Sequence, residues 1–190
     1  MAADPNVMSI AANSWLSEAA QVDRAVYKAV SLTSTPRMDA VMRNVSTAAN
    51  YSRLSIAIAA LVGTTGGARG RRAAASGLVC VGVSEAIVNL AIKPLGHRRR
   101  PDRPSRPTRA VPMPNSRSFP SGHAAAAVAF ASGVARELPA AGVPLQALAA
   151  LVGYSRVHTG VHYPGDVVAG AVLGALIADL ATGVIIRPGT

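Results

Sequence analysis

The first thirty residues show the pattern of an amphipathic helix. Between Ser9 and Ser31 polar side chains recur every three or four positions, while apolar residues such as Trp15, Val22 and Val26 occupy the opposite face. A helix with this pattern lies at a membrane surface or at the edge of a bundle. We therefore predict an amphipathic N-terminal helix within residues 1–35.

Longer apolar segments follow. After Pro36 breaks the chain, a second helix is predicted from about Met38 to Thr65, and the basic segment Gly66 to Arg72 is predicted to be a turn. The apolar runs Ala73 to Leu95 and Gly165 to Ile186 contain 23 and 22 residues. Each is near the ~20 residues that cross the hydrocarbon of a bilayer, so both are predicted to span a membrane.

Two shorter apolar helices are predicted between these spans, at Ser121 to Leu138 and at Pro144 to His158, joined by a turn that contains Pro139, Gly142 and Pro144. Sustained alternation with period two, which would indicate strands, does not occur. The predicted fold class is all-α: a polytopic membrane helix bundle of about six helices, formed by a single domain over residues 1–190.

Composition supports a membrane environment. Half of the 190 residues are hydrophobic and only 15% are charged, whereas about 25% are charged in a typical soluble domain. The alternative is a soluble all-α bundle, whose core helices can also be apolar all round. Four apolar helices in a chain of this length leave too little polar surface for that alternative. The single cysteine, Cys80, excludes an intramolecular disulfide and a cysteine-based zinc cluster.

Residues 96–120 interrupt the apolar pattern. This segment holds seven of the 17 arginines and six of the 13 prolines, so it cannot form a regular helix. One interpretation is a basic linker that binds anionic lipid or nucleic acid without turnover, in a chain of net charge +10. We predict an active-site loop instead, because distinctive motifs stand at both of its ends.

These motifs fall into three groups. They are K-x6-R-P at Lys93, Arg100 and Pro101; P-S-G-H at Pro120 to His123; and S-R-x5-H-x3-D at Ser155, Arg156, His162 and Asp166. Together they resemble the three-part signature of the type 2 phosphatidic acid phosphatase (PAP2) family, membrane lipid phosphatases that share a pocket with soluble acid phosphatases and vanadium haloperoxidases. All eleven specified positions match in order. The resemblance implies a PAP2/acid phosphatase-like helical core.

The residue types suit a phosphate ester independently of the resemblance. Phosphoryl transfer spreads negative charge over three equatorial oxygens, so catalysis depends on cations and backbone donors. Lys93, Arg100 and Arg156 supply three cations, and the arginines offer planar paired donors. Ser121 and Gly122 open a helix, whose free amides and dipole attract an anion. These five residues are the predicted phosphate-binding set.

Two histidines and a carboxylate complete the predicted site. His162 and Asp166 lie four residues apart, with Pro164 suited to a first helical turn, so their side chains can meet on one face. A carboxylate on one ring nitrogen leaves the other free to attack. By resemblance, His162 is the nucleophile that becomes phosphohistidine, Asp166 orients it, and His123 is the general acid and later the base. This scheme requires no metal and no cofactor, and three nearby cations would repel a metal ion.

Several polar residues remain outside the motifs. His97 and His158 are left unassigned. Glu85 with Asn89, and Asp179, lie in apolar helices and are interpreted as structural, the alternative being that they line a lipid entrance. The small residues Gly170, Gly174 and Ala178 predict close helix packing within the bundle rather than a dimer seam.

The resemblance implies hydrolysis of a phosphate monoester from a lipid or polyprenyl-linked substrate in a bacterial inner membrane. The Arg-rich loop could engage a polar, hydroxylated or additional anionic head beyond the scissile phosphate. With the GC-rich bacterial character of the composition, the chain is similar to actinobacterial phosphatases of cell-wall arabinan precursor synthesis, and this resemblance implies decaprenylphosphoryl-5-phosphoribose as the substrate. Phosphatidic acid, phosphatidylglycerol phosphate and a polyprenyl pyrophosphate are the alternatives. Other expected partners are membrane lipids, with a homo-oligomer left open and nucleic acid not expected.

Basic residues suggest an orientation. Setting the motif residues aside, six arginines stand on the predicted active-site side and five on the other. They are Arg98, Arg99, Arg103, Arg106, Arg109 and Arg117 against Arg69, Arg71, Arg72, Arg136 and Arg187. The positive-inside rule then predicts an active site that faces the cytoplasm.

Overall fold

The structure, a computed structural model, describes residues 5–33, 35–103 and 108–184, and these contain seven α-helices and no strand. The helices are α1 (Pro5–Leu32), α2 (Pro36–Ala48), α3 (Arg53–Thr65), α4 (Gly67–Ala86), α5 (Gly122–Glu137), α6 (Pro139–His158) and α7 (Pro164–Val184). The all-α prediction is confirmed, and the helix number is close to the predicted six.

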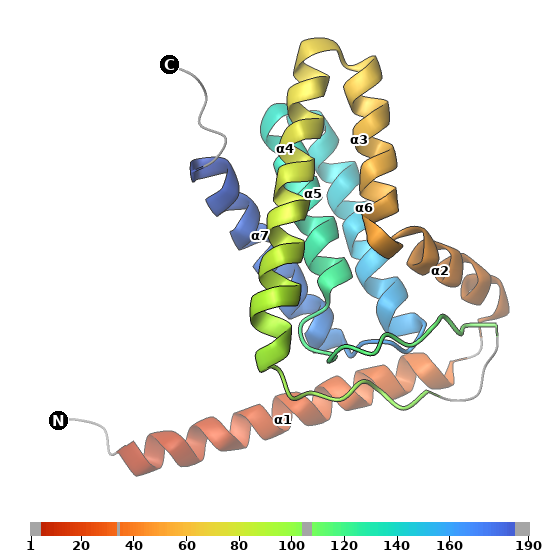
Figure 1. The fold of residues 1–190 in the computed structure, drawn as a ribbon. Coiled ribbons are helices and arrows are strands. Elements are labelled where there is room, and N and C mark those ends of the chain that lie inside the picture. Colours follow the sequence, from red (N-terminus) through yellow and green to blue (C-terminus); the bar gives the residue numbers. More distant parts are fainter. Residues whose placement is uncertain (1–4, 34, 104–107, 185–190) are drawn as a thin grey trace.

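Helices α3 to α7 stand side by side as a bundle, in which α5 packs against α4, α6 and α7 (Figure 1). Alanines make up much of the buried face of α5, so its neighbours can approach closely. Gly170 and Gly174 of α7 lie directly against the backbone of Ser121 and Ala125, where a Cβ would overlap a carbonyl oxygen. The close packing predicted at these two glycines is therefore found between α5 and α7.

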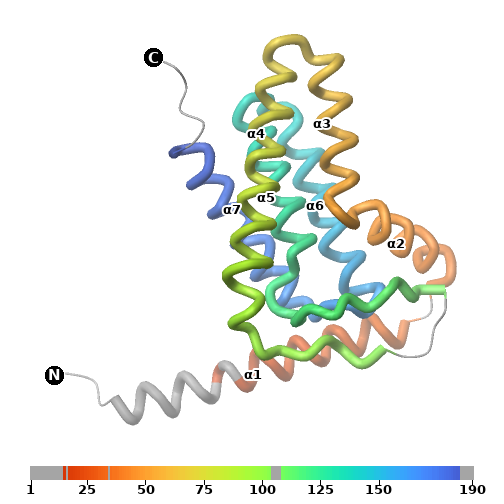
Figure 2. Tube along the Cα trace, in the orientation of Figure 1, coloured from red at the N-terminus to blue at the C-terminus, as the bar shows by residue number. Residues whose placement is uncertain are grey.

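Helix α1 crosses one end of the bundle, beside the chain that connects α4 to α5 (Figure 2). Tyr27 is buried against the rest of the protein, whereas Trp15, Val22 and Val26 are exposed. The apolar face of α1 is thus turned away from the bundle. A bilayer surface can cover such a face, in agreement with the predicted amphipathic helix.

Among the described residues, two helical segments are long and apolar enough to cross a membrane, Gly67–Leu95 and Pro164–Val184, and α2 with α3 would add a third if that bent pair is one span. These two contain the runs predicted to span. Helix α5 has only 16 residues. Because other helices surround it, its length need not match the hydrocarbon thickness.

The predicted continuous helix from Met38 to Thr65 is wrong. The chain bends by 66° between α2 and α3, at a 3-10 turn over Asn50–Ser52. Tyr51 and Ser52 have φ of 55° and 54°, in the left-handed region that costs a non-glycine residue about 1–3 kcal/mol. Neither proline nor glycine occurs within or next to Asn50–Ser52 to signal the break.

Two predicted turns are also shorter than expected. The basic segment Gly66 to Arg72 turns only at Gly66 and Gly67, and Gly67 has a φ of 60°, which glycine adopts at little cost. Pro139 does not belong to a turn but begins α6, where its missing N–H would have had no helical partner. Pro144 lies inside α6 and removes one hydrogen bond near its start.

The end of α4 departs from a regular helix. Ile87–Ile92 form a π-helical turn and Lys93–Leu95 a 3-10 turn. Pro94 has no N–H, and its ring would collide with the carbonyl of Leu90 in a regular α-helix, so a widened turn accommodates it. The helix consequently ends with the Lys93 amine beside Gly122, at the start of α5.

Candidate functional site

The predicted site residues gather at the end of the bundle that α1 crosses. A cavity of about 560 Å³ lies between α3, α5 and α6 and extends to the chain after α4. Part of its wall is apolar and consists of Leu54, Ile58, Phe130, Leu145 and Leu148. Its polar end is formed by Lys93, Arg100, Gly122, His123, Arg156 and His162. Six of the eight predicted site residues therefore border one cavity.

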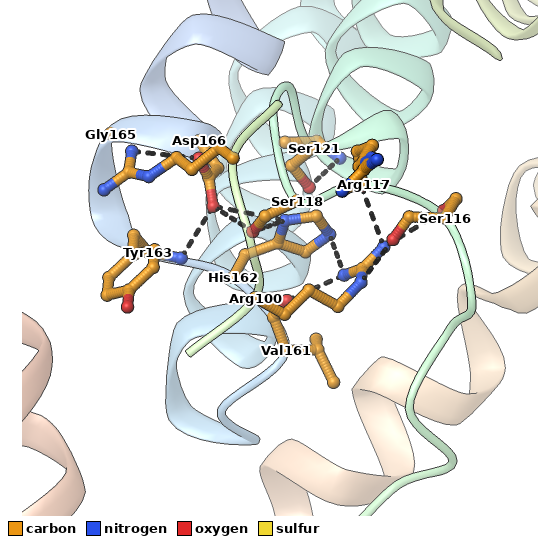
Figure 3. Close-up of polar contacts among 12 residues, drawn as sticks. Arg100, Ser116, Arg117, Ser118, Ser121, Val161, His162, Tyr163, Gly165 and Asp166 are labelled. Atoms are coloured by element: carbon orange, nitrogen blue, oxygen red, sulfur yellow. Dashed lines mark hydrogen bonds and ion pairs between the residues drawn. The ribbon is translucent and has the colours of Figure 1, made fainter. Parts of the chain in front are cut away.

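His162 and Asp166 meet as predicted (Figure 3). The imidazole Nδ1 lies 3.5 Å from Asp166 Oδ2, and both side chains are almost fully buried. Asp166 Oδ2 also accepts hydrogen bonds from the Ser118 hydroxyl at 2.5 Å and from the Tyr163 amide at 2.9 Å. Asp166 Oδ1 accepts one from Arg98 at 3.1 Å. Four donors therefore fix the carboxylate behind His162.

A tight turn after α6 brings His162 beside Arg156. The amides of Val161 and His162 donate to the Arg156 carbonyl at 3.1 and 3.2 Å. The preceding residue, Gly160, has a φ of 73°. A Cβ there would lie 2.6 Å from Arg103 Cγ, so the turn requires glycine for both its conformation and its space.

The second ring nitrogen of His162 faces the loop. Arg100 Nη1 lies 3.1 Å from Nε2, and because arginine can only donate, Nε2 is assigned as the acceptor and Nδ1 as the protonated nitrogen. Burial lowers the pKa of His162 to about 4, and the nearby cations lower it while Asp166 opposes them. The ring is therefore neutral at pH 7, with a lone pair on Nε2.

The guanidinium of Arg100 also holds the loop. Its Nε donates to the Ser116 carbonyl at 2.9 Å, and Nη1 donates to the Val161 carbonyl at 2.7 Å. Burial lowers the pKa of Arg100 from its usual value. Arg100 thus fixes residues 116–117 against the turn that carries His162.

Arg156 is a buried cation that lines the cavity. Its side chain is 2% exposed, and Nη1 donates to the Ser46 hydroxyl at 2.5 Å. Its Nε has no hydrogen-bond partner among the residues that the structure describes. Leaving a buried donor of a charged group unsatisfied costs about 1–3 kcal/mol or more. Because Arg156 lines the cavity, its positive charge lies beside the space in which a phosphate would bind.

Helix α5 begins at Gly122, directly after Ser121, as predicted. The Ser121 side chain caps the helix by accepting from the Ala124 amide at 3.4 Å, and Ser121 is fully buried. Gly122 and His123 border the cavity instead. Phosphate binding by the Ser121 hydroxyl itself stays a prediction.

His123 faces the cavity from the first turn of α5. Its Nε2 lies 3.0 Å from Asn50 Oδ1, a contact made by the bent segment between α2 and α3. His123, at the start of α5, and His162, in the turn between α6 and α7, therefore border the same cavity. This arrangement suits a proton donor opposite a nucleophile.

Helix α1 takes part in the site through Asp23. Its carboxylate forms an ion pair with Arg98 and accepts a hydrogen bond from the Gly165 amide at 2.7 Å, at the start of α7. Arg98 in turn bonds Asp166 and lies 4.3 Å from the centroid of the Tyr163 ring. Asp23 and Arg98 thus connect the surface helix to the carboxylate that orients His162.

The residues left outside the motifs have described contacts. His158 Nε2 lies 2.9 Å from Asp39 Oδ1 in a buried cluster with Arg109. His97 is exposed. Asp179 pairs with Arg136 at the far end of the bundle. Glu85, by contrast, lines the cavity with Asn89. Among the described residues, no group of three His, Cys, Asp or Glu could hold a metal ion.

Several site residues carried no motif. Ser46, Asn50, Ser118, Asp23 and Arg98 contact the predicted residues from segments far away in sequence. Only Arg98 and Ser118, as members of the Arg-rich loop between two motifs, had a signal in the sequence. The other three are ordinary polar residues of helical segments.

Known proteins similar to this chain are phosphatases that act on lipid-linked phosphates. A model of the PAP2 superfamily matches residues 73–187. Decaprenylphosphoryl-5-phosphoribose phosphatase of Mycobacterium tuberculosis is 41% identical over 106 residues, 54% of this chain and 55% of that protein. Lipid A 1-phosphatase of Rhizobium johnstonii is 42% identical over 72 residues, 38% of this chain and 30% of that protein. The chain spans about half the length, or less, of these curated relatives.

Two solved structures share the fold of this chain. The PAP2-type phosphatidylglycerolphosphate phosphatase of Bacillus subtilis superimposes with a TM-score of 0.70 at 26% identity, over 90% of this chain and 88% of that one. Aquifex aeolicus LpxE shares the fold, with a TM-score of 0.69 at 20% identity over 84% of this chain and 93% of that one. These likenesses and the apolar helices identify a membrane protein. Because the family model covers more than half of the chain and the motif residues converge on one cavity, the chain belongs to the PAP2 superfamily.

Proposed function

We propose that this chain acts as a single-domain membrane phosphatase that removes a phosphate monoester from a lipid through a phosphohistidine on His162. One observation carries the proposal: the buried, neutral imidazole of His162 lies at the polar end of a cavity, with Asp166 behind Nδ1 and Arg100 beside Nε2. A nucleophile oriented by a carboxylate and surrounded by cations is what transfer of a dianionic phosphoryl group needs.

The reaction runs in two steps. Nε2 of His162 attacks phosphorus, the N–P bond forms as the P–O bond to the alcohol breaks, and His123 donates a proton to the departing oxygen. Water then attacks the phosphohistidine, His123 accepts its proton, and the N–P bond breaks to release inorganic phosphate. Lys93, Arg100, Arg156 and the amides at Gly122 neutralise the charge on the oxygens.

The apolar wall of the cavity supports a lipid substrate. Leu54 and Ile58 of α3 face Leu145 and Leu148 of α6 across it, so an alkyl or prenyl chain can lie between the helices while its phosphate reaches His162. The relative named decaprenylphosphoryl-5-phosphoribose phosphatase supports that compound as the substrate. Phosphatidic acid, phosphatidylglycerol phosphate and polyprenyl pyrophosphate are the competing choices.

The test is an assay of detergent-purified protein against these four substrates with chelator present. We expect phosphate release, inhibition by vanadate, an acid-labile phosphoprotein in rapidly quenched samples, and the highest kcat/KM for the prenyl phosphoribose. A His162→Ala protein should form no phosphoprotein. Loss of activity in chelator with recovery on adding zinc or magnesium would overturn the metal-free mechanism. A tenfold preference for another lipid, about 1.4 kcal/mol, would overturn the substrate choice only.

A protein that binds polyanions without turnover is the alternative from another class. It is favoured by the exposed basic residues of the loop, such as Arg99 and Arg117. It predicts that anionic lipid binds equally well to the His162→Ala protein and that no phosphate is released. It gives no reason for a buried carboxylate behind a neutral histidine.

We also propose that the chain lies in a bacterial inner membrane with its active site toward the cytoplasm. Basic residues of α1 and α2 at this end of the bundle support that orientation, namely Arg24, Lys28, Arg37 and Arg43. Arg106 and Arg187, which were counted for the orientation, lie outside the described residues.

The exposed position Ala110 offers a test of orientation. In a Cys80→Ala background, Ala110→Cys should resist an impermeant thiol reagent in intact cells and react after lysis. Ready labelling of intact cells would place the site outside.

A further inference from the structure

Glu85 places a negative charge in the cavity that is proposed to bind a phosphate. It lines the same cavity as Lys93, Arg100 and Arg156, and it is only half-buried. A carboxylate near a dianionic phosphate repels it. An acidic side chain at that position therefore opposes phosphate binding, unless it contacts another part of the substrate.

The hydrogen-bond partners of Glu85 carry no charge, although the Lys93 cation lies close enough to interact with it electrostatically. The Ser52 hydroxyl lies 3.5 Å from Oε1, and the Asn89 side-chain amide donates to Oε2. No lysine or arginine among the described residues forms an ion pair with it. An ionised carboxylate has about four lone-pair positions, so Glu85 retains acceptor capacity toward the cavity.

The neighbouring groups share one chemistry. Asn50, Ser52 and Asn89 all line the cavity next to Glu85, and together they offer amide and hydroxyl donors and acceptors beside a carboxylate. The strained segment at Tyr51 and Ser52 brings two of them there. Such a set pairs with hydroxyl groups, which both donate and accept, rather than with a second phosphate.

This polar set borders the phosphate end directly. A side chain built on Gly122 would have its Cβ 3.3 Å from Lys93 Nζ and 3.5 Å from Asn89 Oδ1. Asn89 and Lys93 thus meet at one point at the start of α5. A group held by Glu85 and Asn89 is therefore attached close to the scissile phosphate.

We propose that Glu85, Asn89 and Ser52 form a subsite for the vicinal hydroxyls of a sugar that carries the scissile phosphate. The inference rests on the proposed phosphatase function and adds the residues that would recognise the sugar of its substrate. Glu85 accepts from both hydroxyls of a cis-diol, and the Asn89 and Ser52 side chains complete their hydrogen bonds. Glu85 is then a specificity residue, in contrast to the structural role expected from the sequence.

Two matched substrates test the proposal: dodecyl ribofuranoside 5-phosphate and its 2,3-dideoxy counterpart. The wild-type protein should favour the hydroxylated compound at least tenfold in kcat/KM. In Glu85→Ala this preference should fall to within about twofold, while the rate on the dideoxy compound stays the same or rises because a repulsive charge is gone. Glu85→Gln, of the same size, should give an intermediate preference and serves if the alanine protein does not fold.

The control is Asp179→Asn, which removes a carboxylate from an exposed ion pair outside the cavity, and it should leave the preference unchanged. Equal losses on both substrates in the Glu85 variants, or no preference in the wild type, would overturn the subsite and leave the phosphatase intact. If the wild-type protein cleaves neither compound and forms no phosphoprotein, the proposed function fails, and the subsite fails with it.

Discussion

Both ends of the bundle carry arginine–carboxylate pairs, but these pairs are buried at the active-site end and exposed at the far end. At the active-site end, Arg109 and Asp39 are paired at 2.7 Å with side chains only 6% and 5% exposed. At the far end, Arg72 and Glu137 are paired at 3.1 Å with side chains 62% and 27% exposed. Exposed pairs contribute about 0–1 kcal/mol, whereas removing one partner of a buried pair costs about 3–5 kcal/mol.

Burial, rather than the count of charges, therefore separates the two ends. The buried carboxylates Asp39 and Asp166 each bind several donors. Within the part of the chain that the structure describes, the Asp179 side chain pairs with Arg136 alone, and this pair is more than half exposed. The same substitution should consequently have very different effects at the two ends.

The largest difference is expected for the carboxylates. Asp166→Asn should lower kcat by about 10³-fold or more, because the amide cannot hold the Nδ1–H tautomer of His162. Asp179→Asn should keep wild-type kcat within about twofold. Steady-state rates on any cleaved lipid phosphate give both values, and similar rates for the two variants would contradict the role given to Asp166.

The arginine pairs should differ in stability. Arg109→Ala leaves Asp39 buried without its cation, so the free energy of unfolding should fall by about 3–5 kcal/mol. Arg72→Ala at the far end should change it by less than about 1 kcal/mol. Thermal unfolding in detergent compares them, and equal melting temperatures would show that burial does not govern these pairs.

A smaller effect should come from α1. Asp23→Asn weakens the hold on Arg98 and on the Gly165 amide, so kcat should fall about tenfold, near 1.4 kcal/mol, with KM little changed. Glu18→Gln, an exposed substitution on the same helix, is the control. A change in KM alone would mean that Asp23 serves substrate binding instead of positioning Asp166.

The smallest effect concerns pH. With its pKa lowered to about 4, His162 in the free protein should be about nine-tenths neutral at pH 5. Because the neutral ring is the nucleophile, this form is lost only as the pH falls through 4. Histidine ¹⁵N spectra, compared with those of His162→Ala, give the midpoint directly. A midpoint above 6 would contradict the burial seen at this end.

The contact between His162 and Asp166 could be predicted from the sequence, whereas the break between α2 and α3 could not. The contact of His162 with Asp166 follows from Pro164, because this proline begins α7 and places Asp166 in the first helical turn, directly after the turn that carries His162. The break at Tyr51 could not be predicted, because its left-handed backbone depends on tertiary contacts and not on a local signal. Asn50 was missed for the same reason.

The contacts of Arg100 and Arg156 were equally beyond the sequence. Both were predicted as cations for phosphate, yet the structure gives Arg100 loop carbonyls and leaves Arg156 Nε without a partner among the described residues. Residue type fixes charge and donor geometry. Which donors stay free depends on how residues 116–117 and 161 fold around them.

The position of Asp23 has a consequence for how the chain is made. Its partners Arg98 and Gly165 lie 75 and 142 residues further along, so α1 leaves the ribosome long before the surfaces that receive it exist. While the later helices insert, α1 lies on the bilayer surface, where lipid can cover its exposed apolar face. Its docking against the start of α7 is then a late event in assembly, and it completes the support of Asp166 only after α7 is in place.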